Sequence, residues 1–276
     1  MKSVNTKAAI ATIVVLIITG GFIKQMMNNT KEYTISESIK NIEVYGQSDR
    51  VKIGLSKDDE THITCRKTNK VKVNGDTLVI KEERVLFKII NFNNPDIEIY
   101  LPEKEYEKLV VNTVSGSIEL NDRLGFENAQ IESVSGSIDS DIDVKDKVTY
   151  SSTSGSLNIQ DLDCDSLGIS TISGSIKLDN IISNTSMIIE TTSGSIELDK
   201  VDSPSIEVSS VSGSINATIL SSKQYDISTV SGSISTPQNK GNETCVIETV
   251  SGSINIKWFL ATPFNYCQAI YYQSFI

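Results

Sequence analysis

The tripeptide Ser-Gly-Ser occurs eight times in this chain at a nearly constant interval, and this regularity constrains the fold more than any other feature. Successive central glycines are 19 or 20 residues apart. A fixed period of this size is typical of solenoids, whose stacked turns bury an apolar side that one turn cannot bury alone. The eight glycines are Gly116, Gly136, Gly155, Gly174, Gly194, Gly213, Gly232 and Gly252.

The residues around each glycine alternate between apolar and polar. Positions seven and five before it are mostly apolar, position three before it is always Ser or Thr, and position two after it is always Ile or Leu. A period of two predicts half-buried β-strands. Before the glycine, the apolar residues lie an odd number of positions away from it, and after the glycine they lie an even number away. The glycine must therefore mark a corner or bulge that switches this parity. Glycine suits such a corner because it tolerates positive φ.

We therefore predict an all-β fold, a single-stranded parallel β-helix (β-solenoid) with an N-terminal transmembrane helix. Eight turns stacked roughly 4.8 Å apart would extend about 40 Å. The general handedness of β crossovers favours right-handed winding. A series of antiparallel hairpins, with Ser-Gly-Ser as the turn, is the alternative.

The N-terminal segment Ala8 to Ile23 is apolar and uncharged, and Lys7 and Lys24 flank it. This pattern predicts an uncleaved membrane anchor, with a cleaved secretory signal as the alternative. We expect residues 1–24 to form a cytoplasmic tip and the anchor or signal. The chain would then be a single-pass protein of the cell membrane with an extracellular repeat domain.

The rest of the chain divides by composition. Residues 25–38 are polar and predict a linker, and residues 39–110 predict degenerate first turns or a β cap, since terminal repeats of solenoids are usually atypical. Residues 111–257 hold the eight repeats. Residues 258–276 carry seven of the 17 aromatic residues and no charge. This tail fits a cap, a segment that contacts a partner or the membrane, or an aberrant C-terminus.

The net charge is −10, which disfavours binding to nucleic acid, because phosphate recognition depends on clustered Lys and Arg. It also disfavours direct adsorption to an anionic membrane surface. Solubility of an exposed acidic rod is the simpler interpretation of this charge.

The sequence offers no cluster of catalytic or metal-binding residues. His62 is the only histidine, and no nucleophile elbow, phosphate loop or dinucleotide motif is present. We therefore predict that the chain is not an enzyme and takes no cofactor. The four cysteines lack Cys-x-x-Cys spacing, which argues against zinc. They are Cys65, Cys164, Cys245 and Cys267. Cys245 falls on an inward position, although a disulfide between Cys245 and Cys267 stays open.

Two runs of alternating aspartates could supply oxygen ligands to calcium, but they lack the glycine and distal glutamate of an EF-hand loop. We expect solvated turn charges and no metal. The runs are Asp139, Asp141, Asp143 and Asp161, Asp163, Asp165. The parity also predicts an outward row three positions after each glycine, suited to an extended partner. This row is Glu119, Asp139, Asn158, Lys177, Glu197, Asn216, Ser235 and Asn255.

The unit IETTSGSIELDKV at 189–201, with its relatives VNTVSGSIEL and IETVSGSINI, resembles the bacterial putative-adhesin family of β-strand repeats of unknown function. Members resemble a membrane-anchored protein encoded beside cell-envelope stress regulators in Gram-positive bacteria. The resemblance covers residues 39–256. It implies a β-solenoid outside the membrane and no catalytic residues to carry over.

These observations favour a non-enzymatic, membrane-anchored extracytoplasmic protein, an adhesin or a module that contacts a glycan or protein of the cell envelope. One alternative is an accessory protein of an envelope stress response that binds a membrane partner. A second is an exported carbohydrate-active enzyme, although sugar hydrolysis needs paired carboxylates and the outward acids are scattered.

Overall fold

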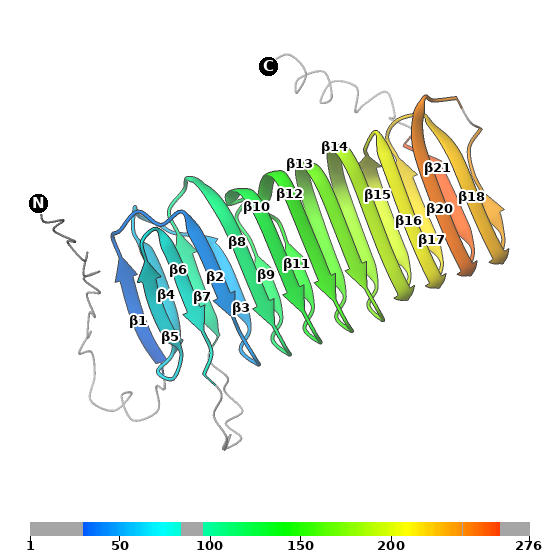
Figure 1. Ribbon diagram of the computed structural model, residues 1–276. Helices are drawn as coiled ribbons and strands as arrows, with labels where there is room; N and C mark the ends of the chain where they lie inside the picture. Colours follow the sequence, from blue (N-terminus) through cyan, green and yellow to red (C-terminus); the bar gives the residue numbers. More distant parts are fainter. Residues whose placement is uncertain (1–29, 84–95, 239, 260–276) are drawn as a thin grey trace, which may run out of the picture.

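The computed structural model describes residues 30–83, 96–238 and 240–259 (Figure 1). These residues form 21 β-strands and no helix, which confirms the all-β prediction. None of them belongs to a helix long and apolar enough to cross a membrane. The predicted anchor within residues 1–24 and the tail beyond Phe259 lie outside the described residues.

Most repeats contribute one strand before their glycine and a separate strand after it, whereas β13 (Leu157–Thr171) and β14 (Ile176–Ser193) each run from one glycine corner to the next. In the first repeat, β8 (Glu105–Thr113) ends three residues before Gly116 and β9 (Ile118–Leu120) begins two residues after it. The later strands are β10 (Gly125–Ser133), β11 (Ile138–Ser140), β12 (Asp143–Ser152), β13 (Leu157–Thr171), β14 (Ile176–Ser193), β15 (Ile196–Asp202), β16 (Ser205–Ser212), β17 (Ile215–Ile219), β18 (Lys223–Ser231), β19 (Ile234–Ser235), β20 (Glu243–Ser251) and β21 (Ile254–Trp258).

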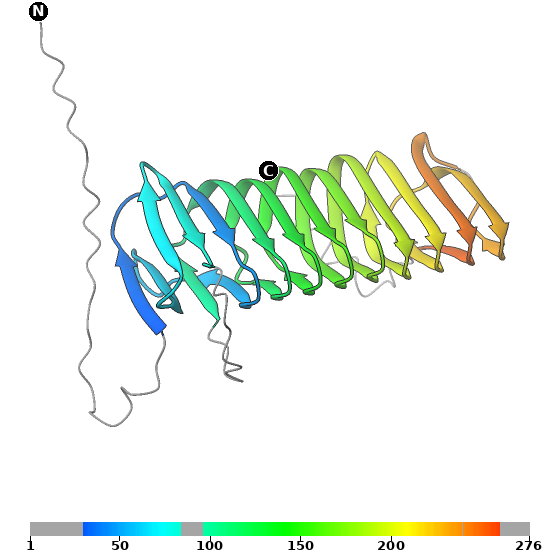
Figure 2. The same cartoon turned by 60° about the horizontal axis from the view of Figure 1, so that its bottom comes forward.

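The turns stack through parallel ladders into an elongated rod (Figures 1 and 2). All strand pairings between β8 and β21 are parallel, which rules out the antiparallel hairpin alternative. The register places equivalent positions side by side, for example Ile131 beside Val111 and beside Tyr150. Right-handed winding stays a prediction.

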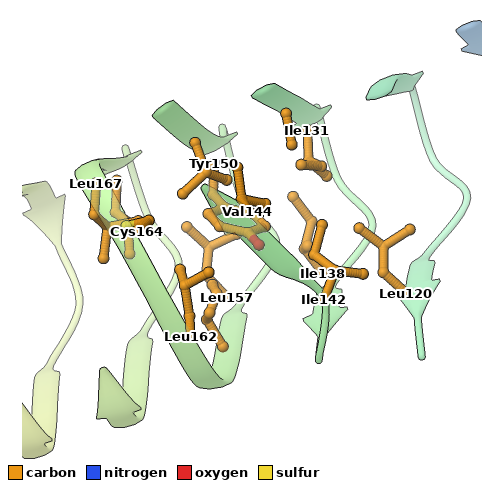
Figure 3. Packing of buried hydrophobic residues seen from close by; sticks show 14 of the residues in the cluster. Leu120, Ile131, Ile138, Ile142, Val144, Tyr150, Leu157, Leu162, Cys164 and Leu167 are labelled. Atoms are coloured by element: carbon orange, nitrogen blue, oxygen red, sulfur yellow. The ribbon is translucent and has the colours of Figure 1, made fainter. Parts of the chain in front are cut away.

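The inward side chains form one continuous core along the rod. Figure 3 shows part of it, in which side chains from the strands before and after the corners, such as Ile131, Tyr150 and Leu157, gather inside the turns. Ile or Leu two residues after the glycine is at most 1% exposed in seven turns, from Ile118 to Ile254. Burying such a side chain stabilises the fold by about 1.5–3 kcal/mol.

The N-terminal end of the rod is closed by antiparallel strands. β1 (Thr30–Ile35) pairs with β4 (Thr61–Arg66), β4 pairs with β7 (Ile97–Leu101), and β5 (Lys70–Asn74) pairs with β6 (Thr77–Lys81). Antiparallel strands with charged residues protect an edge from further pairing.

The order of turns departs from the order of the chain at both ends. β2 (Asn41–Tyr45) lies between β6 and β8, and β3 (Val51–Leu55) lies between β7 and β9. At the other end, β20 lies between β16 and β18, and β21 lies between β17 and β19. Figure 1 shows the orange β20 inside the yellow-orange β18, which forms the outermost turn.

Candidate interaction surface

The repeat glycines stack directly on one another, with no room for a side chain. A Cβ on Gly136 would lie 2.0 Å from the carbonyl oxygen of Gly116, and the same contact measures between 1.8 and 2.2 Å at every repeat glycine. Close backbone approach is therefore what requires glycine at all eight corners. The expected positive φ occurs at only four of them, with φ of 153–158° at Gly194, Gly213, Gly232 and Gly252.

The hydroxyl three residues before the glycine closes the corner in the first half of the rod. The backbone N–H of Gly136 donates to Ser133 Oγ at 2.8 Å, and Gly174 donates to Thr171 Oγ1 at 3.0 Å. From Gly194 onward the corner changes, and the Gly194 N–H donates instead to the carbonyl of Ser212 in the next turn. Within the described residues, the hydroxyls of Thr191, Ser210 and Thr249 then have no hydrogen-bond partner.

The residue two positions before each glycine forms an exposed apolar row, which we call the corner ridge. Nine large hydrophobic residues are exposed in the described chain, and six of them occupy this one position. Their exposed fractions run from 45% at Val134 to 83% at Val230. In spatial order the ridge is Val114, Val134, Thr153, Ile172, Thr192, Val211, Val250 and Val230.

The corner ridge is flanked by uncharged residues on both sides. In all eight turns, the six residues from the hydroxyl before the glycine to the Ile or Leu after it carry no charge. We call this uncharged band the corner strip. It contrasts with a chain whose net charge is −10. An apolar row on a neutral, rigid band is the kind of surface that marks a protein or lipid contact.

A groove of about 500 Å³ runs beside the ridge in the first four turns. One wall is the ridge, and the other is the outward row four positions before the glycine. The ridge wall includes Val134, Thr153 and Ile172, and the opposite wall includes Asn112, Glu132, Ser151 and Ser170. The groove crosses the strands, so an occupant would run along the rod axis.

The outward row predicted as a partner surface lies on a different side of the corner and is occupied by polar and charged residues. Three of its members bond to neighbouring turns: Asn158 Nδ2 donates to Asp139 Oδ1 at 2.6 Å, and Glu119 lies 3.2 Å from Arg50. A second hollow of about 340 Å³ is lined by Lys177, Glu197, Asn216 and Asn255 of this row. This surface is polar but carries both signs of charge.

The aspartate runs are occupied by amide and guanidinium partners. Asn180 Nδ2 donates to Asp161 at 2.6 Å, and Arg123 pairs with Asp143 at 2.8 Å. Burial, followed by the neighbouring carboxylates, raises the pKa of Asp141 even though Arg123 opposes the shift. Neither run brings three carboxylates together as metal ligands in the described part of the chain.

The lone histidine lies in the N-terminal cap, far in sequence from the repeats. His62 Nε2 is 2.8 Å from Asp58 Oδ1, and its Nδ1 is 3.3 Å from Thr34 Oγ1. Asp58, Glu60 and His62 place one donor atom each within 4.8 Å of one another on the surface. His62 is already hydrogen-bonded to Asp58 there, on an exposed part of the cap.

Three cysteines are buried as free thiols, namely Cys65, Cys164 and Cys245. Burial raises the pKa of the Cys164 and Cys245 thiols to about 12. Such thiols are inert because the reactive form is the thiolate. Cys267, the other member of the open disulfide pairing, lies outside the described residues.

The corner ridge was missed by reasoning from the sequence alone, although its signal was present. Positions three, five and seven before the glycine face inward, so position two before it must face outward. That position is Val, Ile or Thr in every repeat. An outward position that is always β-branched and mostly apolar departs from the polar residues expected on an exposed face.

The stack of parallel turns with glycine corners defines an all-β repeat protein. The family model of Toastrack DUF4097 matches residues 39–257, and the chain belongs to this family. This match confirms the resemblance to the putative-adhesin β-repeat proteins of unknown function. None of the curated proteins compared with the chain matches it.

One of the solved structures that resemble the chain supports a shared fold, and two more are less similar. A putative lipid binding protein from Parabacteroides distasonis is 21% identical, with 84% of this chain and 98% of that chain covered and a TM-score of 0.55. A putative adhesin from Bacteroides fragilis is 16% identical, covers 83% and 96%, and has a TM-score of 0.48. A putative adhesin from Parabacteroides merdae is 18% identical, covers 84% and 97%, and has a TM-score of 0.46. At these identities the first structure supports the fold alone.

Proposed function

We propose that this chain is a non-enzymatic interaction module, anchored in the cell membrane and displayed outside it, that acts in adhesion or contact within the cell envelope. Its binding face is the corner strip. The observation that carries this proposal is that, in the described part of the chain, six of the nine exposed large hydrophobic residues share one repeat position. Scattered surface hydrophobics are ordinary, but a continuous apolar row is not.

The rigid spacing of the ridge suits an extended partner. Neighbouring turns present equivalent side chains about 4.8 Å apart, held by parallel ladders and by stacked glycines. A partner that contacts several turns loses little entropy in ordering this surface, because the surface is already fixed. The conserved spacing within the chain therefore supports binding through repeated, individually weak contacts.

The corner hydroxyls support a structural role in place of a catalytic one. Ser133, Ser152 and Thr171 accept hydrogen bonds from the glycine N–H of their own corners. A nucleophilic serine needs a neighbouring base that takes its proton. The residues that line the ridge groove include no His or Lys, and Glu132 is their single acid.

Anchoring would present the rod with its repeats away from the membrane. The described chain enters at β1, and β1 lies at the end of the rod opposite to β18 (Figure 1). A membrane segment within residues 1–24 would therefore hold the capped end and leave the eight turns accessible. This placement supports the extracytoplasmic proposal for an envelope glycan or protein partner.

The proposal can be tested on cells that express the full chain. Membrane fractionation and protease accessibility should place the repeats outside the membrane. The triple variant Val134→Ser, Ile172→Ser, Val211→Ser should reach the surface at the wild-type level and lose most attachment to cells or isolated envelopes. Ile188→Ser is the matched control, since Ile188 is 42% exposed but lies off the ridge. Full attachment by the triple variant would contradict the proposal.

A further inference from the structure

We propose that the partner of the corner strip is the corner strip of a second copy of this chain, packed in the opposite direction about a twofold axis. The inference rests on the proposed function, because it names the partner of that same surface. It would make the adhesion homophilic, with rods on the same or on facing cells joined along their corner ridges.

The ridge matches its own reversed copy. Turns one to four present Val114, Val134, Thr153 and Ile172, and turns five to eight present Thr192, Val211, Val250 and Val230. In a twofold antiparallel pair, turns one to four of one copy face turns five to eight of the other. Each ridge then faces the partner's ridge, with Thr153 opposite Val211 and Ile172 opposite Thr192, so every Thr meets an apolar side chain and the interface is self-complementary as a twofold dimer requires.

The spacing of the turns also favours a second copy as the partner. Side chains that interlock with the ridge over eight turns must recur at the spacing of stacked strands, about 4.8 Å. A second copy repeats them at the same interval by construction, so contacts made at one turn are made at the others.

The distribution of charge restricts where two copies can meet. Two chains of net charge −10 repel each other, and repulsion is weakest where neither surface carries charge. The corner strip is a band of six uncharged positions that continues through all eight turns. The acids nearest the ridge, including Glu132 and Glu190, lie outside this band.

The size of the strip fits a reversible dimer. Eight turns at about 4.8 Å give a length of about 38 Å. With a contact width of roughly 15 Å, the pair would bury about 1,100 Å² in total, at the lower end of specific interfaces. At the N-terminal end of the ridge, the neighbouring turn carries polar Gln47 at the ridge position, where its carbonyl accepts from the Ser115 N–H. The apolar row and the proposed contact therefore end at the same place.

The axis of the pair would pass between Ile172 and Thr192, the fourth and fifth positions of the ridge. Ile172→Asp would place two carboxylates near this axis in the dimer and none in the core, since Ile172 is 53% exposed. Ile188→Asp is the matched control, with the same residue change on the adjacent strand at 42% exposure.

Sedimentation velocity of the full chain in a non-ionic detergent should give a monomer–dimer equilibrium for the wild type and for Ile188→Asp. Ile172→Asp should raise the dissociation constant at least tenfold while keeping the wild-type thermal midpoint. Raising the salt from 0.05 to 0.5 M should strengthen the dimer, because it screens the repulsion between acidic rods. An ionic interface would weaken instead.

A cross-linking experiment tests for the dimer in the membrane of intact cells. Cells carrying the Thr192→Cys variant in a Cys267→Ser background should give a cross-linked dimer with a short bifunctional thiol reagent, while Ile188→Cys in that background should not. A wild-type chain that is monomeric in both assays would overturn the inference. So would a strip that binds neutral phospholipid vesicles while staying monomeric, because its partner would then be lipid.

The same variants separate this inference from the proposed function. A dimer that depends on Ile172, in cells that show no adhesion, would leave the inference standing and remove the adhesive role. If Ile172→Asp abolishes the dimer and adhesion survives, the module is adhesive through a different partner. This outcome would overturn the inference that adhesion is homophilic.

Discussion

The ammonium of Lys223 lies 2.5 Å from Glu243 Oε2, at the place where the last two turns of the rod exchange their order. Lys223 is fully buried. Its Nζ also lies 2.5 Å from Asp202 Oδ1 and donates to the carbonyl of Ser203 at 2.6 Å. One cation therefore joins three neighbouring turns whose order in the stack (β16, β20, β18) differs from their order in the chain. A buried charge is tolerated only when its partners are in place, so the group favours this order of turns over others.

Removing this cation should loosen the C-terminal turns. Lys223→Ala leaves two carboxylates facing each other and a gap in the core, and should lower the free energy of unfolding by about 2–4 kcal/mol. Hydrogen exchange should speed up in β16 to β21 and stay unchanged in β8 to β12. Lys177→Ala, at an exposed position, is the control. Uniform protection across both halves of the Lys223 variant would show that the ion group does not hold the exchanged turns.

The glycine stack predicts a large difference between two Gly-to-Ala changes. A Cβ at Gly155 would lie 2.0 Å from the Gly136 carbonyl oxygen, whereas a Cβ at Gly168 in β13 would meet Thr149 Cγ2 at 3.5 Å, an ordinary contact. Gly155→Ala should cost about 2–3 kcal/mol, because the backbone must shift. Gly168→Ala should be neutral or stabilise by up to about 1 kcal/mol. Chemical denaturation measures both, and equal midpoints would refute close backbone stacking.

The buried thiols should resist alkylation in the native protein. Burial raises the pKa of Cys65 to about 11 and that of Cys245 to about 12, so at pH 8 very little of either thiol is ionised. Iodoacetamide followed by mass spectrometry should label neither residue within an hour, nor Cys164. Labelling in denaturant provides the control. Rapid native labelling of Cys245 would show that the exchanged turns open readily.

Acid should remove the stabilising contribution of Glu82, which holds the loop between β2 and β3. Burial works to raise the pKa of this carboxyl, but the N–H groups of Ser48, Gln47 and Asp49 outweigh it, and the pKa is lowered from 4.5. Ser48 N donates to Glu82 Oε2 at 2.9 Å. The stabilisation is therefore present above pH 4.5 and is lost as the pH falls through the lowered folded-state value.

Glu82→Gln should lower the free energy of unfolding at pH 7 by about 1 kcal/mol, since the carboxylate is half-buried and only part of its charged hydrogen bonding is lost. Urea titrations of both proteins from pH 7 to pH 3 should show the difference shrinking below pH 4.5. A difference that stays constant to pH 3 would mean that the ionised carboxylate is not what the loop requires.

Local periodicity is the part of this fold that the sequence predicts best. The inward rows, such as Val111, Ile131 and Ile169, follow from alternation alone, because a half-buried strand allows no other pattern. The corner at each glycine follows from the change of parity. The sequence did not reveal why the corner requires glycine. The clash between a Cβ and the neighbouring carbonyl depends on how the turns stack and not on any one repeat.

The order in which the turns stack could not be predicted from the sequence, because the strands of different turns have nearly the same pattern of inward residues. β18 and β20 both carry inward residues that match β16, and the buried Lys223 group that distinguishes them appears only in three dimensions. Asp49 is another such case. It takes the corner position beside Gly116, where its buried carboxylate lies 2.6 Å from Arg66, yet the local sequence Ser48-Asp49-Arg50 keeps only the first Ser of Ser-Gly-Ser.

The insertion of β20 between β16 and β18 bears on how the chain is made. A ribosome releases β18 before β20 exists, and at that moment β16 offers β18 a free edge with a matching apolar pattern. The finished rod requires these two strands to be apart. The last turn must therefore either arrive before the previous one has docked or displace it afterwards, so the rod cannot be completed by adding turns in the order of synthesis.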